Sequence, residues 1–359
     1  MNRPAYVFTI LLLAFFMSRD ADAGVFAYIG SGLEDSVSVV DTSTRVVTDV
    51  IPDIDSPSGS AVTPNGRYVY ITSVIADGVV NVIRTLDNKV VAVIPVEGAP
   101  VGVAVTPDGA RAYVVNNGPG TISEINTFTN NVVETFDITN GADSVYIAIT
   151  PDGLFFYVTN QANSLVNVFR TSDNSHVTDI DTTFSQQGLD VTPDGAFVYV
   201  ALTDGTVGVI RTSDNALVDT IPAGMLPRGV VITPDGAFAY VANANDDTVS
   251  VIRISDNTVI NTINIGDEPR GIDVTPDGAF VFCVNSGDNS ISIIRTSDNQ
   301  VVDTISNAFG GTIGTFIAEV PSISNPIPTL SEWGMIAAAA GLGLIGVLFA
   351  FRRKRMHDA

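Results

Sequence analysis

Short apolar runs rich in valine and isoleucine follow one another along residues 24–320, and each run ends at a cluster of turn-forming residues. One stretch shows the pattern well, with runs at 229–233, 238–242, 248–254 and 258–265. Alternating or β-branched runs bounded by turn residues are typical of short antiparallel strands. The pattern therefore predicts an all-β chain.

The turn sequences recur at a nearly constant distance. Thr-Pro-Asp-Gly, or Thr-Pro-Asn-Gly at its first occurrence, has its threonine at positions 63, 106, 150, 192, 233 and 275. Proline presets φ at the second turn position and glycine tolerates positive φ at the fourth, so the motif connects two strands. A second turn, Ser-Asp-Asn, stands in the other half of several units. Four strands in a unit of about 42 residues are typical of a β-propeller blade.

The two ends of this region supply different strands of one blade. Residues 25–30 match the second strand of the later units, and residues 314–320 match their first strand. Counting then gives seven strands of each kind, so we expect a seven-bladed β-propeller of four-stranded blades over residues 24–320. The C-terminal strand joins the first blade and closes the ring. An open solenoid is the alternative architecture, but it gives no reason for splitting one blade between the two ends.

The units also resemble YVTN-family β-propeller repeats of bacterial and archaeal surface proteins. The residues that carry the resemblance are Tyr240-Val241-Ala242-Asn243, Phe282-Cys283-Val284-Asn285, residues 248–252 and the repeated Gly-x-x-x-Thr-Pro-Asp-Gly. The chain departs from the family where the third strand often has aspartate, because arginine stands there at positions 84, 170, 211, 253 and 295. The resemblance implies a propeller and a surface location, without a ligand.

The N-terminus has the features of a secretory signal peptide. Arg3 precedes the apolar run 5–17, and Ala21 and Ala23 form a small-x-small cleavage site before Gly24. We expect residues 1–23 to be removed on export. An uncleaved membrane anchor is the alternative, although the run is short for a bilayer.

The C-terminus predicts a membrane anchor. Residues 335–351 carry no charge and are followed by a basic tail, 352–359. A helix of this length spans roughly 26 Å, which suffices when Trp333 lies at the interface. The basic tail should remain cytoplasmic and the propeller should lie outside the cytoplasm, anchored in the inner membrane before processing.

A short motif lies in the linker 321–334 before this helix. It comprises Ile327, Pro328, Thr329, Leu330, Trp333 and Gly334. Followed by an apolar helix and a basic cluster, it resembles the IPTL-CTERM sorting signal of Gram-negative bacteria, a relative of the PEP-CTERM tails. The resemblance implies cleavage near the motif by an exosortase-type membrane protease, which leaves the propeller on the cell surface or releases it. A plain C-terminal anchor is the alternative.

Composition excludes several classes of function. The chain has 39 acidic and 17 basic residues, a net charge of −22, which argues against a nucleic-acid partner. A single cysteine and two histidines leave no disulfide framework and no metal site rich in these residues. His176 is expected at the start of an outer strand, and Cys283 in a buried one, so neither suggests catalysis. We therefore expect a protein that is not an enzyme.

Candidate binding residues lie where the repeat varies. The entries to the innermost strands align as Ser58, Val101, Ser144, Gln187, Arg228, Arg270 and Ile313. Arg228 and Arg270 belong to neighbouring blades, each within Pro-Arg-Gly, and two guanidinium groups there can hold a carboxylate, sulfate or uronate. Alternatively, each arginine pairs with a nearby acid such as Asp267, Glu268 or Asp273.

Loop acids offer a calcium alternative, although no cofactor is expected. Hard oxygen ligands suited to Ca²⁺ stand at Asp53, Asp55, Asp204, Asp246, Asp247 and Asp288. No loop has the spacing of a dedicated calcium motif, and turn formation explains the acids equally well.

The sequence favours a secreted, envelope-anchored propeller that binds an envelope protein, a polysaccharide or a matrix component. The main alternative is an extracytoplasmic lactonase- or lyase-like enzyme that acts on an anionic sugar or lactone at the channel mouth. A purely structural coat protein is a third hypothesis.

Overall fold

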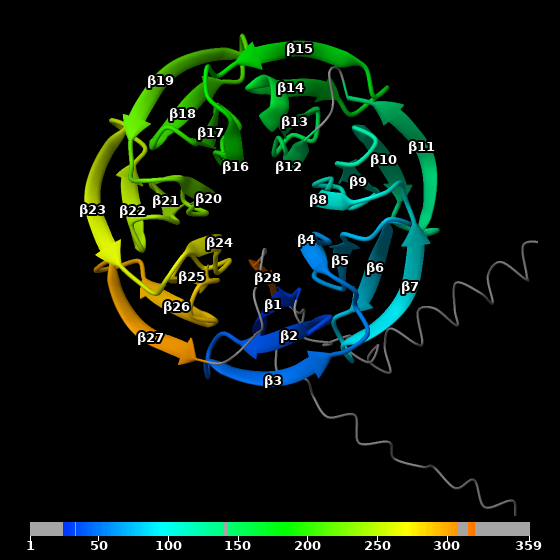
Figure 1. The fold of residues 1–359 in the computed structure, drawn as a ribbon, viewed down its shortest axis with the longest axis horizontal. Helices are drawn as coiled ribbons and strands as arrows, with labels where there is room; N and C mark the ends of the chain where they lie inside the picture. Colours follow the sequence, from blue (N-terminus) through cyan, green and yellow to red (C-terminus); the bar gives the residue numbers. More distant parts are fainter. Residues whose placement is uncertain (1–23, 33, 139–142, 307–314, 320–359) are drawn as a thin grey trace, which may run out of the picture. The chain divides into compact units, whose positions relative to one another are not determined.

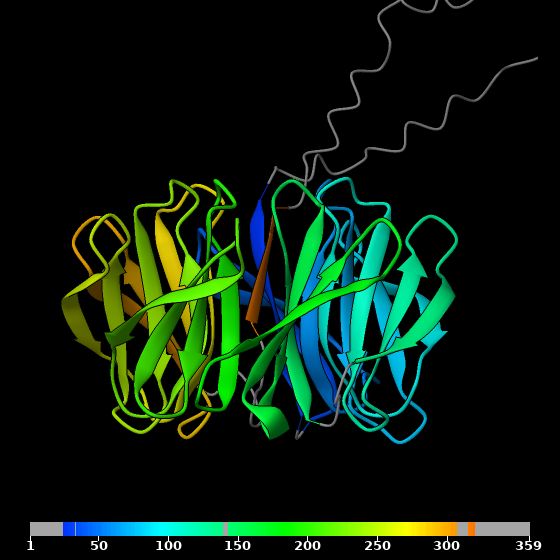
Figure 2. The ribbon, with the colours of Figure 1, turned by 90° about the horizontal axis from the view of Figure 1, so that it is seen from above.

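The computed structural model describes residues 24–32, 34–138, 143–306 and 315–319, which form seven four-stranded antiparallel sheets arranged in a ring (Figure 1). Seen from the side, the sheets form a disc whose strands run between its two faces (Figure 2). The predicted seven-bladed propeller is therefore confirmed.

Each blade runs from the central channel to the outer rim, and the innermost strands line the channel. The innermost strands are β4 (Pro57–Val62), β8 (Pro100–Val105), β12 (Ser144–Ile149), β16 (Gln186–Val191), β20 (Pro227–Ile232), β24 (Pro269–Val274) and β28 (Thr315–Glu319). The second strands are β1 (Val25–Ser31), β5 (Tyr68–Ser73), β9 (Arg111–Asn116), β13 (Phe155–Asn160), β17 (Phe197–Leu202), β21 (Phe238–Asn243) and β25 (Phe280–Asn285).

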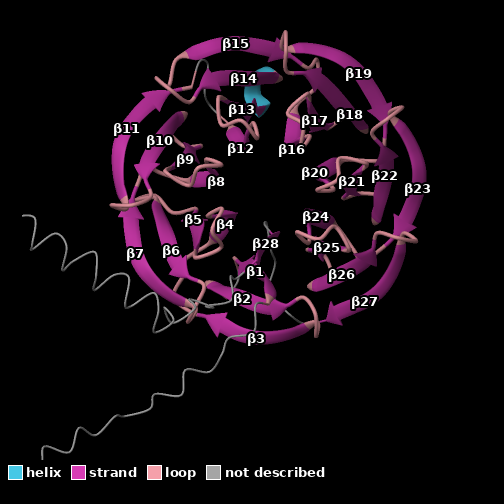
Figure 3. Cartoon of the chain, turned by 180° about the vertical axis from the view of Figure 1, so that it is seen from behind, coloured by secondary structure: helices cyan, strands magenta, loops and turns pink. Residues whose placement is uncertain are grey.

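The third and fourth strands build the outer half of each blade. The third strands are β2 (Ser36–Asp41), β6 (Val79–Arg84), β10 (Thr121–Asn126), β14 (Leu165–Arg170), β18 (Thr206–Arg211), β22 (Thr248–Arg253) and β26 (Ser290–Arg295). The outermost strands are β3 (Val46–Ile51), β7 (Lys89–Pro95), β11 (Asn131–Asp137), β15 (His176–Asp181), β19 (Ala216–Pro222), β23 (Thr258–Asn264) and β27 (Gln300–Ser306). A 3-10 turn, η1 (Gln161–Asn163), follows β13 (Figure 3).

The ring closes as the sequence predicted. The first blade has the strand order β28-β1-β2-β3, with Val25 opposite Glu319 and Ile29 opposite Thr315. Blades are numbered here from this one, so β4 begins the second blade and β24 the seventh. The predicted signal peptide, sorting motif, helix 335–351 and basic tail lie outside the described residues. In the part of the chain that is described, no helix is long and apolar enough to cross a membrane.

Apolar side chains between neighbouring blades form the core. One cluster, for example, joins Val231 and Tyr240 of the sixth blade to Ile272 and Val281 of the seventh. Burial of apolar surface stabilises folded proteins by roughly 25 cal/mol per Å², so the contacts between neighbouring blades stabilise the ring.

Glycine allows the innermost strands to approach one another closely. A Cβ atom at Gly59 would lie 2.1 Å from the carbonyl oxygen of Val101 in the next blade, and one at Gly229 would lie 2.5 Å from that of Arg270. A side chain at this position therefore needs a local adjustment of the neighbouring strand. In the fourth blade Tyr146 stands at this position. Its amide donates to the hydroxyl of Thr159 in the second strand, as the Gly59 amide donates to that of Thr72.

A tyrosine–asparagine hydrogen bond joins the blades near the repetitive face. In six of the seven blades, a buried tyrosine of the second strand donates to the Oδ1 atom of an asparagine in the outer turn of the next blade. The pairs are Tyr28–Asn88, Tyr70–Asn130, Tyr113–Asn174, Tyr157–Asn215, Tyr199–Asn257 and Tyr240–Asn299, with distances of 2.6–3.1 Å. At the junction of the seventh and first blades, Phe282 and Arg45 stand at the corresponding positions. The closing junction therefore lacks this bond.

The repeated turns satisfy their own polar groups. In the Thr-Pro-Asp-Gly turn at 233, the Gly236 amide donates to the Thr233 carbonyl (2.7 Å), and the threonine hydroxyl donates to Asp235 (2.6 Å). These hydrogen bonds from Thr233 and the Ala237 amide hold the pKa of Asp235 below its usual value. The turns are therefore scaffold.

Most of the unusual third-strand arginines pair locally with an aspartate three residues later. The pairs are Arg84–Asp87, Arg211–Asp214, Arg253–Asp256 and Arg295–Asp298, at 2.6–2.7 Å. Arg170 instead lies over the Phe155 ring at 5.9 Å. Four of these arginines therefore stabilise the outer turns of their own blades.

Candidate functional site

Strand register identifies which residues stand at the entrance to the channel. Pro227 pairs with Asn243 and Pro269 with Asn285, so Arg228 and Arg270 occupy equivalent positions, as predicted. In the fourth blade Ser144 pairs with Asn160, so the equivalent residue is Val145. The predicted alignment of Ser144 with the arginines was wrong by one residue, while Ile313 lies outside the described residues.

The two arginines have different partners. Arg228 donates from Nη1 to the Gln187 side-chain oxygen (2.9 Å), and among the described residues no carboxylate pairs with it. Arg270 forms an ion pair with Glu268, which is one of the acids considered as alternative partners. In both arginines the Nε atom is buried without a hydrogen-bond acceptor among the described residues. Because an unpaired buried donor is costly, both groups are suited to an acceptor that the protein does not supply.

Tyr146 is a third polar group at this entrance, and the sequence analysis did not identify it. Burial raises the pKa of its hydroxyl, while the positive charges of Arg228 and Arg270 act to lower it. The hydroxyl has no hydrogen-bond partner among the described residues, and the side chain lines the central cavity. The signal in the sequence was the break in the glycine pattern, since tyrosine replaces glycine only in this blade among β4, β8, β12, β16, β20 and β24.

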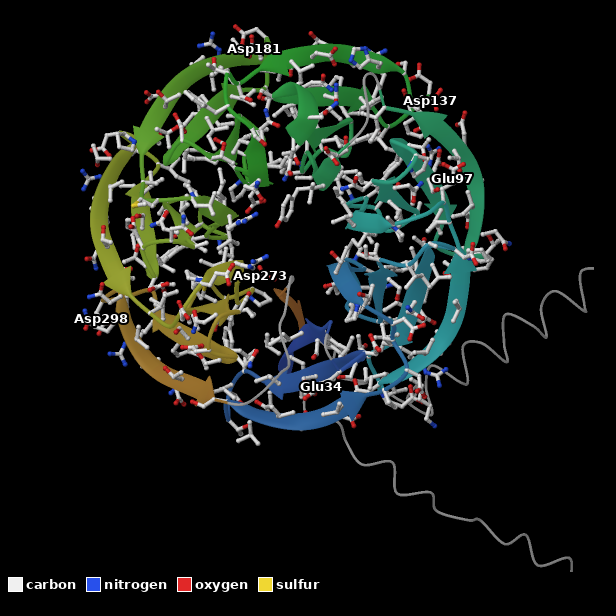
Figure 4. The ribbon with its side chains drawn as sticks, in the orientation of Figure 1. Glu34, Glu97, Asp137, Asp181, Asp273 and Asp298 are labelled. Atoms are coloured by element: carbon white, nitrogen blue, oxygen red, sulfur yellow. The ribbon has the colours of Figure 1, made fainter. Side chains whose placement is uncertain are left out.

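The innermost strands enclose a cavity of about 330 Å³, a size that suits a small organic molecule. Its wall is mostly apolar and glycine-rich, and its polar side chains include Tyr146, Arg270, Asp190 and Asp273. Figure 4 places Asp273 at the inner rim of the ring, whereas Asp181 and Asp298 lie at the outer rim.

Asp190 and Asp273 occupy the same position in β16 and β24. Register pairs Asp190 with Tyr199 and Asp273 with Phe282, and the strand between them has Val231 there. The second, third and fourth blades have alanine at this position. Two carboxyl groups therefore stand three residues further along the strands than the arginines, at a level where the other described strands are apolar.

Asp190 is embedded in protein, yet it keeps accessible surface because the cavity reaches it. One carboxyl oxygen accepts the Val191 amide and the other accepts the Ile232 amide of the next blade, both at 2.8 Å. Burial raises the pKa of Asp190 to about 6, and the two amide hydrogen bonds oppose this only in part. No ion pair compensates the carboxylate within the described residues.

The acids considered for calcium mainly hold loops together. Asp246 accepts the Met225 amide (2.6 Å), Asp247 accepts the Glu268 amide (3.0 Å), and Asp288 accepts the Asp267 amide (3.1 Å). Nearby Asp247 and Asp288 raise the pKa of Asp267. Among the described residues, no group of three or more His, Cys, Asp or Glu side chains has the arrangement of a metal site.

His176 and Cys283 lie where the sequence placed them. His176 begins the outermost strand β15, 2.6 Å from Asp179 and with its ring edge against Phe169. Cys283 is fully buried, and burial raises its thiol pKa. Neither contributes to the channel.

Two family models match the chain. Residues 215–307 match "Lactonase, 7-bladed beta-propeller", and residues 325–355 match the IPTL-CTERM motif. The predicted propeller and sorting motif are thus confirmed. The motif implies a C-terminal sorting signal processed by an exosortase-type enzyme, and hence export and sorting to the envelope. No curated protein matches the chain.

Solved structures share the fold at low identity. Hydrazine synthase of Kuenenia stuttgartiensis is 22% identical with a TM-score of 0.70, covering 75% of this chain and 92% of its own. A functionally unknown protein from Desulfotomaculum acetoxidans is 20% identical with a TM-score of 0.73, covering 82% and 99%. The dihydro-heme d1 dehydrogenase NirN, in complex with DHE, is 15% identical with a TM-score of 0.63, covering 83% and 75%. These likenesses concern the fold alone.

Proposed function

We propose that the protein is an exported binding module of the cell envelope that holds an anionic group at the mouth of its central channel. Arg228 carries the proposal, because its buried Nε donor lacks an acceptor and no carboxylate among the described residues neutralises its charge. Arg270 and Tyr146 line the central cavity and provide further donors, and the charges of both arginines act on the Tyr146 hydroxyl. The anion belongs to a small molecule or to the end of an envelope polysaccharide.

The sorting motif supports the envelope location. In this proposal residues 1–23 direct export, the helix 335–351 anchors the protein in the inner membrane, and an exosortase-type enzyme then cuts near the motif at 327–334. The propeller acts outside the cytoplasm, where carboxylated sugars, sulfate and phosphate esters are accessible ligands.

Anion titration by calorimetry tests the binding role. Sulfate, phosphate, gluconate and galacturonate serve as probes for the unmodified propeller and for Arg228→Ala. Loss of a charge-assisted hydrogen bond weakens binding by about 1.5–3 kcal/mol, or roughly ten- to a hundredfold. The Arg270→Ala loss should be smaller, because Glu268 already neutralises that guanidinium.

Arg84→Ala is the matched control, since Arg84 is paired with Asp87 on the repetitive face. It removes the same charge far from the channel and should leave anion affinity within twofold. Equal losses from Arg84→Ala and Arg228→Ala would indicate general charge attraction. Absence of binding at millimolar concentration would reject the site.

Lactone hydrolysis is a second candidate. It is supported by the match of residues 215–307 to a lactonase-type model and by Asp190, whose pKa of about 6 suits a general base near neutral pH. A panel of sugar lactones, assayed by acid release, should then show turnover that Asp190→Asn lowers at least a hundredfold. Turnover equal to the spontaneous rate for every lactone would exclude this candidate.

A further inference from the structure

The central cavity carries both signs of charge at different depths, and this selects among anions. Arg270 and Tyr146 line it near the entrance, and Asp190 and Asp273 line it three residues further along the strands. Each of these strands has a register shift at this point, where three residues cover two of the partner strand, so the two levels are roughly 7 Å apart along the strand. A ligand that enters past the arginines therefore meets carboxylates with its other end.

The Asp190 carboxylate has no positively charged partner among the described residues. Its pKa is raised by burial, and backbone amides are the only groups that act against this shift. An unpaired carboxylate in a low-dielectric site is costly, and a cation that joins it recovers much of that cost. Asp273 lines the same cavity at the same level, two strands further round the ring.

We propose that the ligand is a zwitterion, an ω-amino acid or a related amino-bearing anion. Its anionic group lies at Arg228 and Arg270, its apolar middle follows the alanine and valine wall, and its ammonium group lies at Asp190. This inference rests on the proposed anion site and specifies what occupies the rest of the same cavity.

Calorimetry with matched probes tests the inference. Hexanoate supplies the anion and chain alone, and 6-aminohexanoate adds the ammonium group. At pH 7.5, where Asp190 is mostly ionised, the zwitterion should bind at least tenfold more tightly than hexanoate. A series from glycine to 8-aminooctanoate locates the best spacing between the two charges.

Asp190→Asn should reverse this preference. Removing the carboxylate should weaken the binding of 6-aminohexanoate about tenfold or more, because the ammonium group loses its partner. It should strengthen the binding of hexanoate, because a charge of the same sign as the ligand leaves the cavity. Asp273→Asn repeats the test at the second carboxyl group if Asp190→Asn does not fold. Asp214→Asn removes an exposed acid of the repetitive face and should change neither affinity.

The outcomes separate this inference from the proposed function. If hexanoate and the other anions bind but an amino group gives no advantage at any chain length, the zwitterion is wrong and the anion site stands. If no anion and no zwitterion binds, both are wrong. Tight binding of hexylamine alone, unaffected by Arg228→Ala, would leave the acids as a cation site and overturn the zwitterion.

Discussion

Substitution of Tyr199 tests how much one hydrogen bond between blades contributes to the free energy of unfolding. Its hydroxyl donates to Asn257 Oδ1 at 2.6 Å, and its ring is buried. Tyr199→Phe keeps the ring and removes only the hydroxyl. An intramolecular hydrogen bond contributes about 0.5–1.5 kcal/mol net, and water can reach the partly exposed Asn257 once the hydroxyl is gone. The free energy of unfolding should therefore fall by about 1 kcal/mol.

The closing junction allows the reverse experiment. Phe282→Tyr alone buries a hydroxyl opposite Arg45, where the asparagine acceptor of the other junctions is missing. Because a buried donor without an acceptor is costly, the free energy of unfolding should fall by about 1–3 kcal/mol. Arg45→Asn supplies the acceptor and relieves a non-glycine residue with φ of 61°, which asparagine tolerates better than arginine. It also removes weak contacts of Arg45 with Phe280 and Asp303, at 5.2 and 3.7 Å.

A double-mutant cycle isolates the bond itself. Urea unfolding of the four proteins, followed by circular dichroism, should give a favourable coupling of about 1 kcal/mol between the two changes. Tyr68→Phe is the control, because the Tyr68 hydroxyl has no hydrogen-bond partner among the described residues, and it should change stability by less than about 0.5 kcal/mol. A coupling of zero, or equal effects of Tyr199→Phe and Tyr68→Phe, would refute the role given to these pairs.

Three further predictions concern the channel acid, the closure and the tail. In the folded protein the pKa of Asp190 is raised from 3.8 to about 6, so the folded state binds a proton more tightly than the unfolded state does. The free energy of unfolding, relative to that of Asp190→Asn, should therefore fall by up to about 3 kcal/mol as the pH rises from 3.8 to above 6. If urea unfolding of the two proteins gives parallel pH profiles, this prediction is wrong. A chain ending at Gly311 lacks β28 and should unfold at lower temperature and less cooperatively than one ending at Pro326; equal calorimetric transitions would contradict the closure. In the native host, mass spectrometry should find cleavage within 327–333; an intact C-terminus on the surface form would favour a plain anchor.

The blade count and the closing strand could be predicted because they depend on local chemistry. Each Thr-Pro-Asp-Gly turn marks the same point in a blade, so counting turns counts blades. The error at Ser144 arose in the entry to its strand, where the other blades vary as well. Counting back five residues from Thr150, as from Thr233 to Arg228, gives Val145, the residue that the structure places there.

The candidate site was only partly predictable, because its members meet through ring closure. Arg228 and Arg270 stood out by their shared Pro-Arg-Gly context. Asp190 looked like one more polar position of an alternating strand, and its raised pKa depends on burial by strands that are distant in sequence. The bond between Tyr199 and Asn257 was equally hidden, since both residues recur with the blade and nothing in the sequence says which copies pair.

Departures from the repeat are concentrated on one side of the channel. At the entrance and the deeper level, β4 and β8 present Ser58, Val101 and two alanines. β12 has Val145 and Ala148 at these two positions and Tyr146 beside them, whereas the next three strands present Gln187 with Asp190, Arg228 with Val231, and Arg270 with Asp273. Blade packing alone would accept small residues at all of these positions, as it does in β4 and β8. Charged side chains that β4, β8 and β12 lack at these levels are gathered on the three consecutive strands β16, β20 and β24, and this clustering favours the proposed ligand lying against that wall.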